Sequence, residues 1–324
     1  MAALNDPRAA QPALADDTRV DQRARPCITV LLATYNGTRW LDEQLHSIVA
    51  QANVVVSIVA SDDASTDGTP LRLTEWSTRA ALTVLPPSGQ RFGSAHRNFL
   101  RLIRDAPLGD ADYVALADQD DVWLPGKLAR AVHCLRTLGA AGYSSDVTAF
   151  WPDGRRRLVR KSQPQRSHDH LFGSPGPGCT FVMPRAAFDR MREWVDAGFE
   201  QMQGIWVHDW LIYAYVRGHG LRWHIDDQPN MQYRQHGRNE IGVNAGWRAA
   251  LSRWRHVRSG AYRRDILAIA DVVGDTSAMV AAVRRLTLLD RLRLILSARS
   301  FRRRLGDCAI LAFFVLVMPR DSRR

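Results

Sequence analysis

The sequence has few cysteines, and their spacing excludes the usual cysteine-based sites. Among 324 residues there are four, with no CxxC pair and no histidines at zinc-finger spacing: Cys27, Cys134, Cys179 and Cys308. A disulfide framework or a structural zinc site needs more closely organised cysteines. We therefore expect four reduced cysteines, as is usual in a cytosolic protein.

Long apolar segments and secretion signals are also missing. The longest uncharged apolar run, Cys308 to Met318, is shorter than the roughly 20 residues that a membrane-spanning helix needs. Residues 1–25 lack the apolar centre of a signal peptide, so we expect them to form a polar, disordered leader. Both absences favour a chain that stays in the cytoplasm.

Two further absences concern glycine and lysine. The glycines form neither a GxGxxG nor a Walker A pattern, so neither a dinucleotide fingerprint nor a P-loop is supported. Between Trp247 and Arg324 there are 17 Arg, no Lys and 6 Asp, which accounts for the whole formal net charge of +11. A basic segment of this kind predicts an anionic surface as partner, either lipid head groups or nucleic acid.

The most informative stretch that is present runs from Tyr113 to Trp123. Five apolar residues, typical of a buried strand, lead directly into Asp118, Asp120 and Asp121. Ligands in open α/β sheets bind beyond the carboxyl ends of strands, and neighbouring carboxylates repel one another unless they share a cation. Because Mg²⁺ combines such carboxylates with substrate phosphates, the cluster predicts a phosphate-bearing substrate. The alternative is that Asp121 caps the next helix and the other two aspartates are solvated.

Alternating strands and helices predict the fold of the first part of the chain. Strands are expected at residues 27–35, 54–60, 82–85 and 113–117, with helices between them. This alternation predicts a mostly parallel sheet with helices on both sides and right-handed crossovers. Loops would then carry one set of polar side chains to the same edge of the sheet: Asp62, Asp63, Arg97, Asp118 and Asp120.

The pattern becomes less regular after a helix predicted at residues 124–138. Strands are expected at 143–150 and 179–183, an edge strand at 221–225, and a mobile polar loop at 152–170. Gly178 ends a turn rich in Gly and Pro, where the backbone could approach a ligand closely. An ordinary tight turn explains the same residues equally well.

Two later motifs carry candidate chemistry. Asp209 lies among aromatic residues at the start of a predicted helix, where the helix N-terminus stabilises a carboxylate that could act as a base. Helix capping is the alternative role. His236 lies in a polar loop beside Arg234 and Arg238 and could complete a metal site formed by aspartates, although a structural role is the commoner one for a single histidine.

The segment from residue 246 to 324 is predicted to be helical and interfacial. Leucines and arginines alternate between Arg284 and Arg299, and Arg302 to Arg304 precede the apolar run. Arginines beside an apolar face are typical of helices that lie on anionic membranes. The alternative is that these helices pack on the rest of the protein with solvated arginines.

Together these residues resemble the family 2 glycosyltransferases of the GT-A fold, and in detail the bacterial rhamnosyltransferases that use a dTDP-sugar. The resemblance covers Cys27 to about Gly242 and rests on five ordered motifs: residues 32–37, 61–69, 116–123, 208–210 and 233–239. It implies an α/β fold with a mostly parallel, Rossmann-like sheet. The chain would consist of the leader (1–25), a GT-A domain (26–245) and a C-terminal helical extension (246–324).

The resemblance also implies an inverting, metal-dependent sugar transfer, with L-rhamnose from dTDP-L-rhamnose as the expected donor. Eight residues would bind the nucleotide-sugar: Thr34, Tyr35, Asn36, Asp62, Asp63, Arg97, Asp118 and Gln119. Mg²⁺ or Mn²⁺ would be held by Asp118, Asp120 and His236, and Asp209 would be the catalytic base. Four residues would face the acceptor: Gly178, Trp206, His208 and Trp210.

The implied acceptor is a cell-surface glycan or a polyprenyl-diphosphate-linked saccharide, met at the inner face of a bacterial plasma membrane. Other interpretations stay open: a family 2 transferase for another sugar such as galactofuranose, a metal-dependent phosphohydrolase, or a nucleic-acid-binding module. We expect no nucleic-acid partner, because the arginines alternate with leucines and not with aromatic residues that stack on bases.

Overall fold

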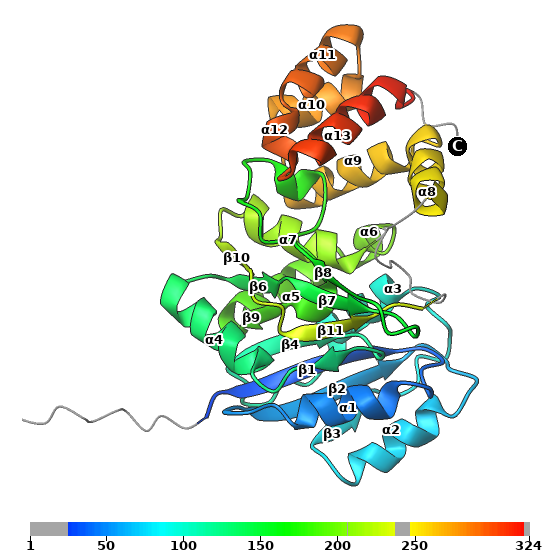
Figure 1. Cartoon of the computed structure of the whole chain (residues 1–324), viewed down its shortest axis with the longest axis vertical. Helices are drawn as coiled ribbons and strands as arrows, with labels where there is room; N and C mark the ends of the chain where they lie inside the picture. Colours follow the sequence, from blue (N-terminus) through cyan, green and yellow to red (C-terminus); the bar gives the residue numbers. More distant parts are fainter. Residues whose placement is uncertain (1–24, 206, 237–246, 321–324) are drawn as a thin grey trace, which may run out of the picture.

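The computed structural model describes residues 25–205, 207–236 and 247–320, which form an α/β region with a group of helices at one end (Figure 1). A seven-stranded sheet has the order β10-β6-β9-β4-β1-β2-β3. Its first four strands in sequence run parallel to one another: β1 (Cys27–Thr34), β2 (Val55–Asp62), β3 (Leu82–Val84) and β4 (Tyr113–Ala117). The predicted parallel arrangement of these strands is confirmed.

Helices cover both faces of this sheet, which explains why β1 and β4 are almost wholly buried. One face packs against α1 (Leu41–Val49), α2 (Thr69–Ser77) and α4 (Lys127–Leu138). The other packs against α3 (Ala95–Asp105), α5 (Arg185–Ala197) and α7 (His208–Gly218). A short helix, α6 (Phe199–Met202), precedes α7. Pairing of Thr34 with Asp62 and of Leu32 with Ala117 brings the ends of β1, β2 and β4 to one edge.

The strand predicted at residues 143–150 is wrong, because the chain turns at Asp146. It forms β6 (Gly142–Ser145) in the large sheet and β7 (Val147–Phe150) in a second, four-stranded sheet. The buried carboxylate of Asp146 accepts hydrogen bonds from the backbone of Lys161 and Ser162, which fixes the turn. The second sheet also contains β5 (Val122–Trp123), β8 (Arg156–Val159) and β11 (Met231–Arg234).

Three further segments differ in detail from the predictions. Residues 152–170 are not a continuous loop, since they contain β8 and the start of the 3-10 turn η1 (Asp169–Leu171). Residues 179–183 form another 3-10 turn, η2 (Gly178–Thr180), and then the antiparallel strand β9 (Val182–Pro184). The predicted edge strand is confirmed as β10 (Trp223–Asp226).

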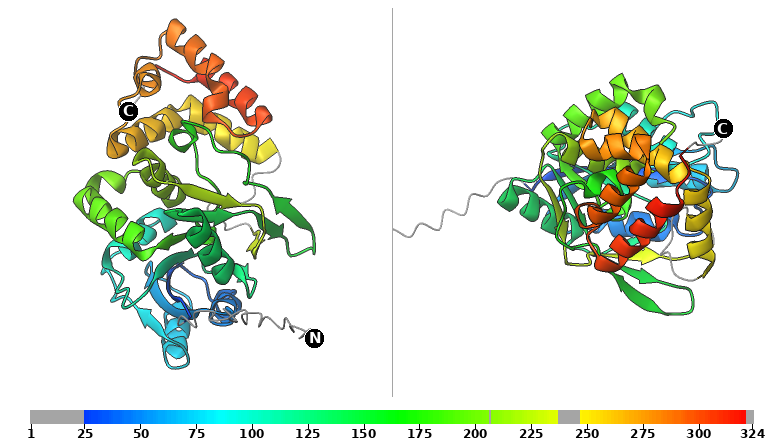
Figure 2. Two further views of the ribbon diagram at one scale, coloured as in Figure 1. Left: turned by 90° about the vertical axis from the view of Figure 1, so that its left-hand side faces the viewer. Right: turned by 90° about the horizontal axis from the view of Figure 1, so that it is seen from above.

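The C-terminal helices lie at the end of the molecule opposite to β2 and β3 (Figures 1 and 2). They are α8 (Trp247–Arg258), α9 (Ala261–Val273), α10 (Ala278–Arg285), α11 (Leu288–Leu296), α12 (Ala298–Phe301) and α13 (Leu305–Val317). Tyr262 and Phe301 share a buried cluster with Phe172 and Trp210, so the helices pack on the α/β region. Within the described parts of the chain, no helix is both long and apolar enough to cross a membrane.

The structure does not test the predicted boundaries between the leader, the GT-A domain and the C-terminal extension. Residues 1–24 of the predicted leader and the boundary at 245/246 lie outside the described residues.

Candidate active site

A cleft of about 910 Å³ opens where β1, β2 and β4 end. Its walls come from distant parts of the sequence, including the loops after these strands, the start of α7, the end of β11 and the C-terminal helices. Eleven of the predicted site residues line it: Thr34, Tyr35, Asn36, Asp63, Asp118, Gln119, Asp120, Gly178, His208, Asp209 and His236. The structure thus brings most of the predicted side chains into one cavity.

Gln119 connects the loop after β1 to the loop after β4. Its Oε1 accepts a hydrogen bond from the backbone N–H of Tyr35, and its Nε2 donates to the Tyr35 carbonyl, both at 2.8 Å. A Cβ atom on Gly37 would lie 2.1 Å from Gln119 Oε1, so a side chain there would displace the Gln119 amide. This two-point contact fixes the backbone next to Asp118 and Asp120.

Two of the predicted metal ligands, Asp120 and His236, are in direct contact. Their Oδ2 and Nε2 atoms are 2.6 Å apart, and the imidazole stacks on Trp40 with ring centroids 4.0 Å apart. Asp118 lies on the same cleft wall. Two carboxylates and an imidazole are suitable donors for a divalent cation, so this set fits the metal that the resemblance implies.

Asp121 has a different position from its two neighbours. It is fully buried and accepts a hydrogen bond from the Arg234 backbone N–H at 3.0 Å. Helix α4 begins after Gly126, so the alternative in which Asp121 caps this helix is wrong. Burial, followed by the charges of Asp120 and Asp118, raises the pKa of Asp121 well above its usual value. The loop after β4 therefore brings three mutually repelling carboxyl groups together: Asp118, Asp120 and Asp121.

Asp62 and Asp63 point in different directions from the end of β2. Asp63 is buried at the cleft wall and accepts a hydrogen bond from the Gly93 backbone N–H at 2.9 Å. Asp62 is not part of the described cleft lining, because it accepts hydrogen bonds from Thr34 Oγ1 and the Ser65 backbone N–H, both at 2.8 Å. Asp62 orders the loop, whereas Asp63 faces the cavity.

Arg97 is not placed where the sequence predicted. Its Nε and Nη1 atoms approach the carbonyl oxygens of Gln203 and Phe92 at 3.4 and 3.5 Å, and it is absent from the described cleft lining. Arg91 lies in the cleft instead, with its Cζ atom 4.1 Å from the centroid of the Tyr35 ring. Arg91 belongs to an irregular loop, whose course no periodic pattern in the sequence reveals.

Asp209 lies in the first turn of α7 and lines the cleft beside His208. The His208 ring stacks on Phe99 with centroids 4.0 Å apart, and burial lowers the pKa of this histidine to about 3. A Cβ atom on Gly178 would lie 2.3 Å from His208 Nε2. The close approach predicted at Gly178 is therefore to a neutral imidazole of the protein itself.

The two tryptophans of this motif do not line the described cleft. Trp210 is buried, and its Nε1 donates to the His170 carbonyl at 2.7 Å, which is a structural contact. Trp206 lies outside the described residues.

Asn36 lies in the loop after β1 and lines the cleft, as predicted. Its Oδ1 accepts a hydrogen bond from the Thr66 backbone N–H at 2.8 Å.

Sequence reasoning missed the basic residues of the cleft. Arg157, Lys161, Arg253, Arg302 and Arg304 line the cavity together. The first two belong to the segment expected to be a mobile loop, and the last three to the predicted membrane extension. Only the packing of the extension on the α/β region brings them together.

Comparison with known proteins identifies the family. Residues 29–191 match the model of glycosyl transferase family 2. The dTDP-rhamnosyl transferase RfbG of Shigella flexneri is 40% identical over 248 residues, which cover 76% of this chain and 86% of that protein. An uncharacterized glycosyltransferase of Nostoc is 31% identical over 140 residues, covering 43% of this chain and 41% of that protein.

A solved structure supports the same assignment at the level of the fold. Staphylococcus aureus TarS 1-349, crystallised in complex with UDP-GlcNAc, has a TM-score of 0.56 and 14% sequence identity. The alignment covers 90% of this chain and 81% of that chain. The predicted GT-A fold is confirmed, and the chain belongs to glycosyl transferase family 2.

Proposed function

We propose that this glycosyltransferase moves L-rhamnose from dTDP-L-rhamnose to a hydroxyl group of a cell-surface glycan or lipid-linked saccharide, with inversion at the anomeric carbon. The observation that carries the proposal is the convergence of Asp118, Asp120 and Asp209 in one cleft, although they come from distant parts of the sequence. The 40% identity to a dTDP-rhamnosyl transferase supports the choice of donor.

The donor binds at the end of the cleft formed by the loops after β1, β2 and β4. Thr34, Tyr35, Asn36 and Asp63 surround the nucleoside in this proposal, and Arg91 adds a positive charge near its phosphates. Asp118, Asp120 and His236 would hold Mg²⁺ or Mn²⁺. When bound, the cation neutralises the negative charge that develops on the leaving diphosphate.

Asp209 is the proposed catalytic base. Its carboxylate takes the proton from the acceptor hydroxyl while the oxygen of that hydroxyl bonds to the anomeric carbon. The bond between the anomeric carbon and the diphosphate oxygen breaks in the same step, so a single displacement inverts the configuration. Because its pKa is about 3, His208 stays neutral and does not compete for the proton near pH 7.

The substitution Asp209→Asn tests this assignment. We expect transfer to fall by roughly 10²–10⁴-fold, the range for loss of a general base, while affinity for dTDP stays nearly unchanged. Radiolabelled sugar transfer and calorimetry with dTDP would measure the two quantities. Asp227→Asn is a matched control, because Asp227 is exposed and outside the described cleft lining. Normal transfer by Asp209→Asn would refute the role of this residue as base.

Donor choice needs a separate test, because other family 2 enzymes use other sugars. A panel of nucleotide sugars, each with and without Mg²⁺ or Mn²⁺, would be screened for protection against thermal unfolding, since a bound ligand stabilises the native state. We expect the largest metal-dependent increase in Tm with dTDP-L-rhamnose. A larger increase with UDP-galactofuranose would contradict the proposed donor.

We also propose that the protein works at the inner face of the plasma membrane, docked through α11 and α13. Four leucines of α11 are exposed by 84, 79, 54 and 77%: Leu288, Leu289, Leu292 and Leu296. Leu305, Phe313 and Leu316 of α13 are at least half exposed. The extension also contains the entire excess of positive charge. Apolar side chains beside cationic ones are suited to anionic lipid.

A further inference from the structure

Charges of opposite sign occupy different parts of the cleft. Asp63, Asp118 and Asp120 come from loops at the carboxyl ends of β2 and β4. Basic side chains come from β8, from the segment after it and from the C-terminal helical region: Arg157, Lys161, Arg253, Arg302 and Arg304. The acidic part suits a metal and the donor diphosphate. The basic part is not used by the reaction described above.

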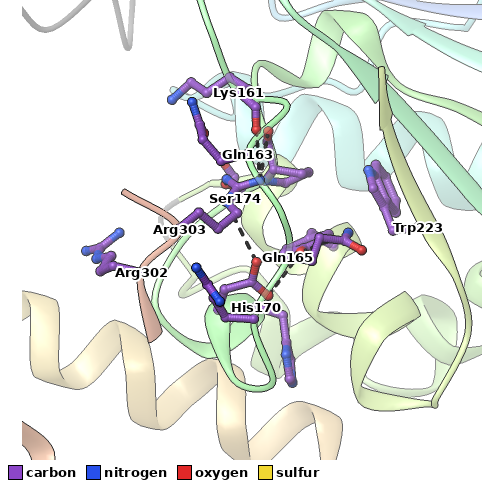
Figure 3. A network of polar contacts seen from close by, with 12 residues as sticks. Lys161, Gln163, Gln165, His170, Ser174, Trp223, Arg302 and Arg303 are labelled. Carbon is purple, nitrogen blue, oxygen red and sulfur yellow. Dashed lines mark hydrogen bonds and ion pairs between the residues drawn. The ribbon is translucent and has the colours of Figure 1, made fainter. Parts of the chain in front are cut away.

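Arg303 holds this basic wall in position. Its Nη2 donates to the Ser174 carbonyl at 2.7 Å, and its Nε lies 3.7 Å from Asp169 Oδ2. Figure 3 shows Arg303 within this network, while the neighbouring Arg302 extends to the other side of the backbone. Arg302 Nη2 donates to Tyr262 Oη at 2.7 Å. The buried Arg303 thus serves the structure and leaves its two neighbours at the cleft.

Lys161 brings a third positive charge to the same wall. Its backbone N–H is held by Asp146, but its Nζ has no carboxylate within 4.0 Å among the described residues. Burial and the charge of Arg303 lower the pKa of Lys161, while Asp209 and Asp307 act in the opposite direction. Asp307 is the acidic residue that the extension contributes to the described lining. Asp209 and Asp307 together carry less charge than Lys161, Arg302 and Arg304.

An apolar surface adjoins this basic wall. Ile310 and Phe314 of α13 line the cleft with Arg302, Arg304 and Asp307. Ile310 is 48% exposed, and the next turn continues to the exposed Phe313 and the proposed membrane-facing side of α13. A ligand held here would therefore meet cationic groups close to Asp209 and an apolar strip leading outward.

We propose that Lys161, Arg302 and Arg304 form a second phosphate subsite, which binds the phosphate groups of the acceptor, with Ile310 and Phe314 against its lipid. This inference rests on the proposed function, because it places the acceptor hydroxyl at Asp209. Guanidinium groups donate to phosphate oxygens in a fixed fork, and a lysine ammonium adds a point charge. The substrate class is a lipid-linked saccharide phosphate and not a neutral glycan.

Binding experiments on the full chain test the subsite without requiring activity. With dTDP and Mg²⁺ saturating, and Mg²⁺ in excess over all diphosphates, calorimetry would compare farnesyl diphosphate, inorganic pyrophosphate and farnesol. We expect farnesyl diphosphate to bind most tightly. Lys161→Gln and Arg304→Gln should each weaken its binding by roughly 10-fold, the loss typical of one charged hydrogen bond. Arg299→Gln, at an exposed position outside the described lining, should leave it unchanged.

Each contrary result has a distinct meaning. Two results would overturn the subsite and leave the proposed transferase function standing. The wild-type protein could bind dTDP normally but not farnesyl diphosphate. Alternatively, Lys161→Gln and Arg304→Gln could both bind farnesyl diphosphate with the affinity of the wild-type protein. Failure of the wild-type protein to bind dTDP would refute the proposed function instead. Equal affinities for pyrophosphate and farnesyl diphosphate would overturn the assignment of a lipid-linked substrate.

Discussion

At the scale of single residues, burial controls which side chains carry charge. His96, His170 and His208 are all buried, and desolvation is the largest cause of the shift in each. Their pKa values fall from 6.5 to about 4, about 4 and about 3, respectively. The native state therefore keeps three neutral imidazoles, two of which (His96 and His208) line the cleft, at a pH where the unfolded chain protonates them.

These three histidines predict that stability depends on pH. Their contribution is complete above pH 6.5, the ordinary pKa, and is lost as the pH falls towards 4, because only the unfolded state binds the protons. At pH 5 each histidine should lower the free energy of unfolding by about 2 kcal/mol relative to pH 7.5. Urea unfolding at the two pH values measures the loss.

Substitution of one histidine isolates its share of the effect. His208→Asn should reduce the difference in unfolding free energy between pH 7.5 and pH 5 by about 2 kcal/mol. His46→Asn is the control, because His46 is exposed. An equal pH dependence in His208→Asn and the wild-type protein would show that burial does not keep this imidazole neutral.

The residue scale also shows what sequence can predict about the site. Asp118, Asp120 and Asp209 follow or begin regular elements, so their positions at the cleft could be expected from strand and helix patterns. The choice between Asp62 and Asp63 could not, because it depends on a hydrogen bond from Thr34 on a neighbouring strand. Loop geometry decides such cases, and no local pattern encodes it.

At the scale of elements, long-range polar contacts decide where chain segments begin and end. The change from β6 to β7 depends on Asp146 and its contacts with residues 161–162. In the sequence these residues lie in a polar stretch with no strand or helix period, so one continuous strand was the simpler expectation. By contrast, β4 has a regular pattern, and its predicted bounds, 113–117, are those of the structure.

The network around Arg303 predicts how the segment after β8 is held. Arg303→Leu removes an ion pair with Asp169 and hydrogen bonds to the carbonyls of Ser174 and Lys161. Asp169 keeps its hydrogen bonds from Tyr213 and its ion pair with Arg217, but it loses one of its two cations in a buried environment. We expect a loss of roughly 3 kcal/mol in unfolding free energy and faster tryptic cleavage after Lys161.

A matched variant separates this contact from a general effect of charge. Arg299→Leu removes the same charge from an exposed position and should change neither stability nor cleavage by much. If Arg303→Leu unfolded at the same urea concentration as Arg299→Leu, with the same cleavage rate, the extension would not hold this segment in place.

At the scale of the whole molecule, the C-terminal extension has two sides with different roles. One side shares a core with the α/β region through Tyr262, Phe301 and Leu311. The sequence predicted an amphipathic, basic extension. That pattern is compatible both with packing on the α/β region and with contact to a membrane. Packing on the α/β region is confirmed, while membrane contact stays a prediction. Deleting the extension would expose buried core, so point variants on α11 are the better test.

The exposed face of α11 predicts binding to anionic vesicles. Replacing its four exposed leucines by serine leaves the arginines in place and removes the apolar groups that would enter the lipid: Leu288, Leu289, Leu292 and Leu296. Burial of a leucine contributes roughly 1.5–3 kcal/mol, so we expect the fourfold variant to bind at least about 10-fold more weakly. Co-sedimentation with vesicles of phosphatidylglycerol and phosphatidylcholine measures this affinity.

Two controls define the cause of any change in binding. Leu71→Ser replaces a leucine of α2 that is 64% exposed at the other end of the molecule, and it should bind like the wild-type protein (Figure 1). Vesicles of phosphatidylcholine alone should bind much less protein, because the net charge of the extension then has no anionic partner. If the fourfold variant sedimented as the wild-type protein does with anionic vesicles, α11 would not be the docking face.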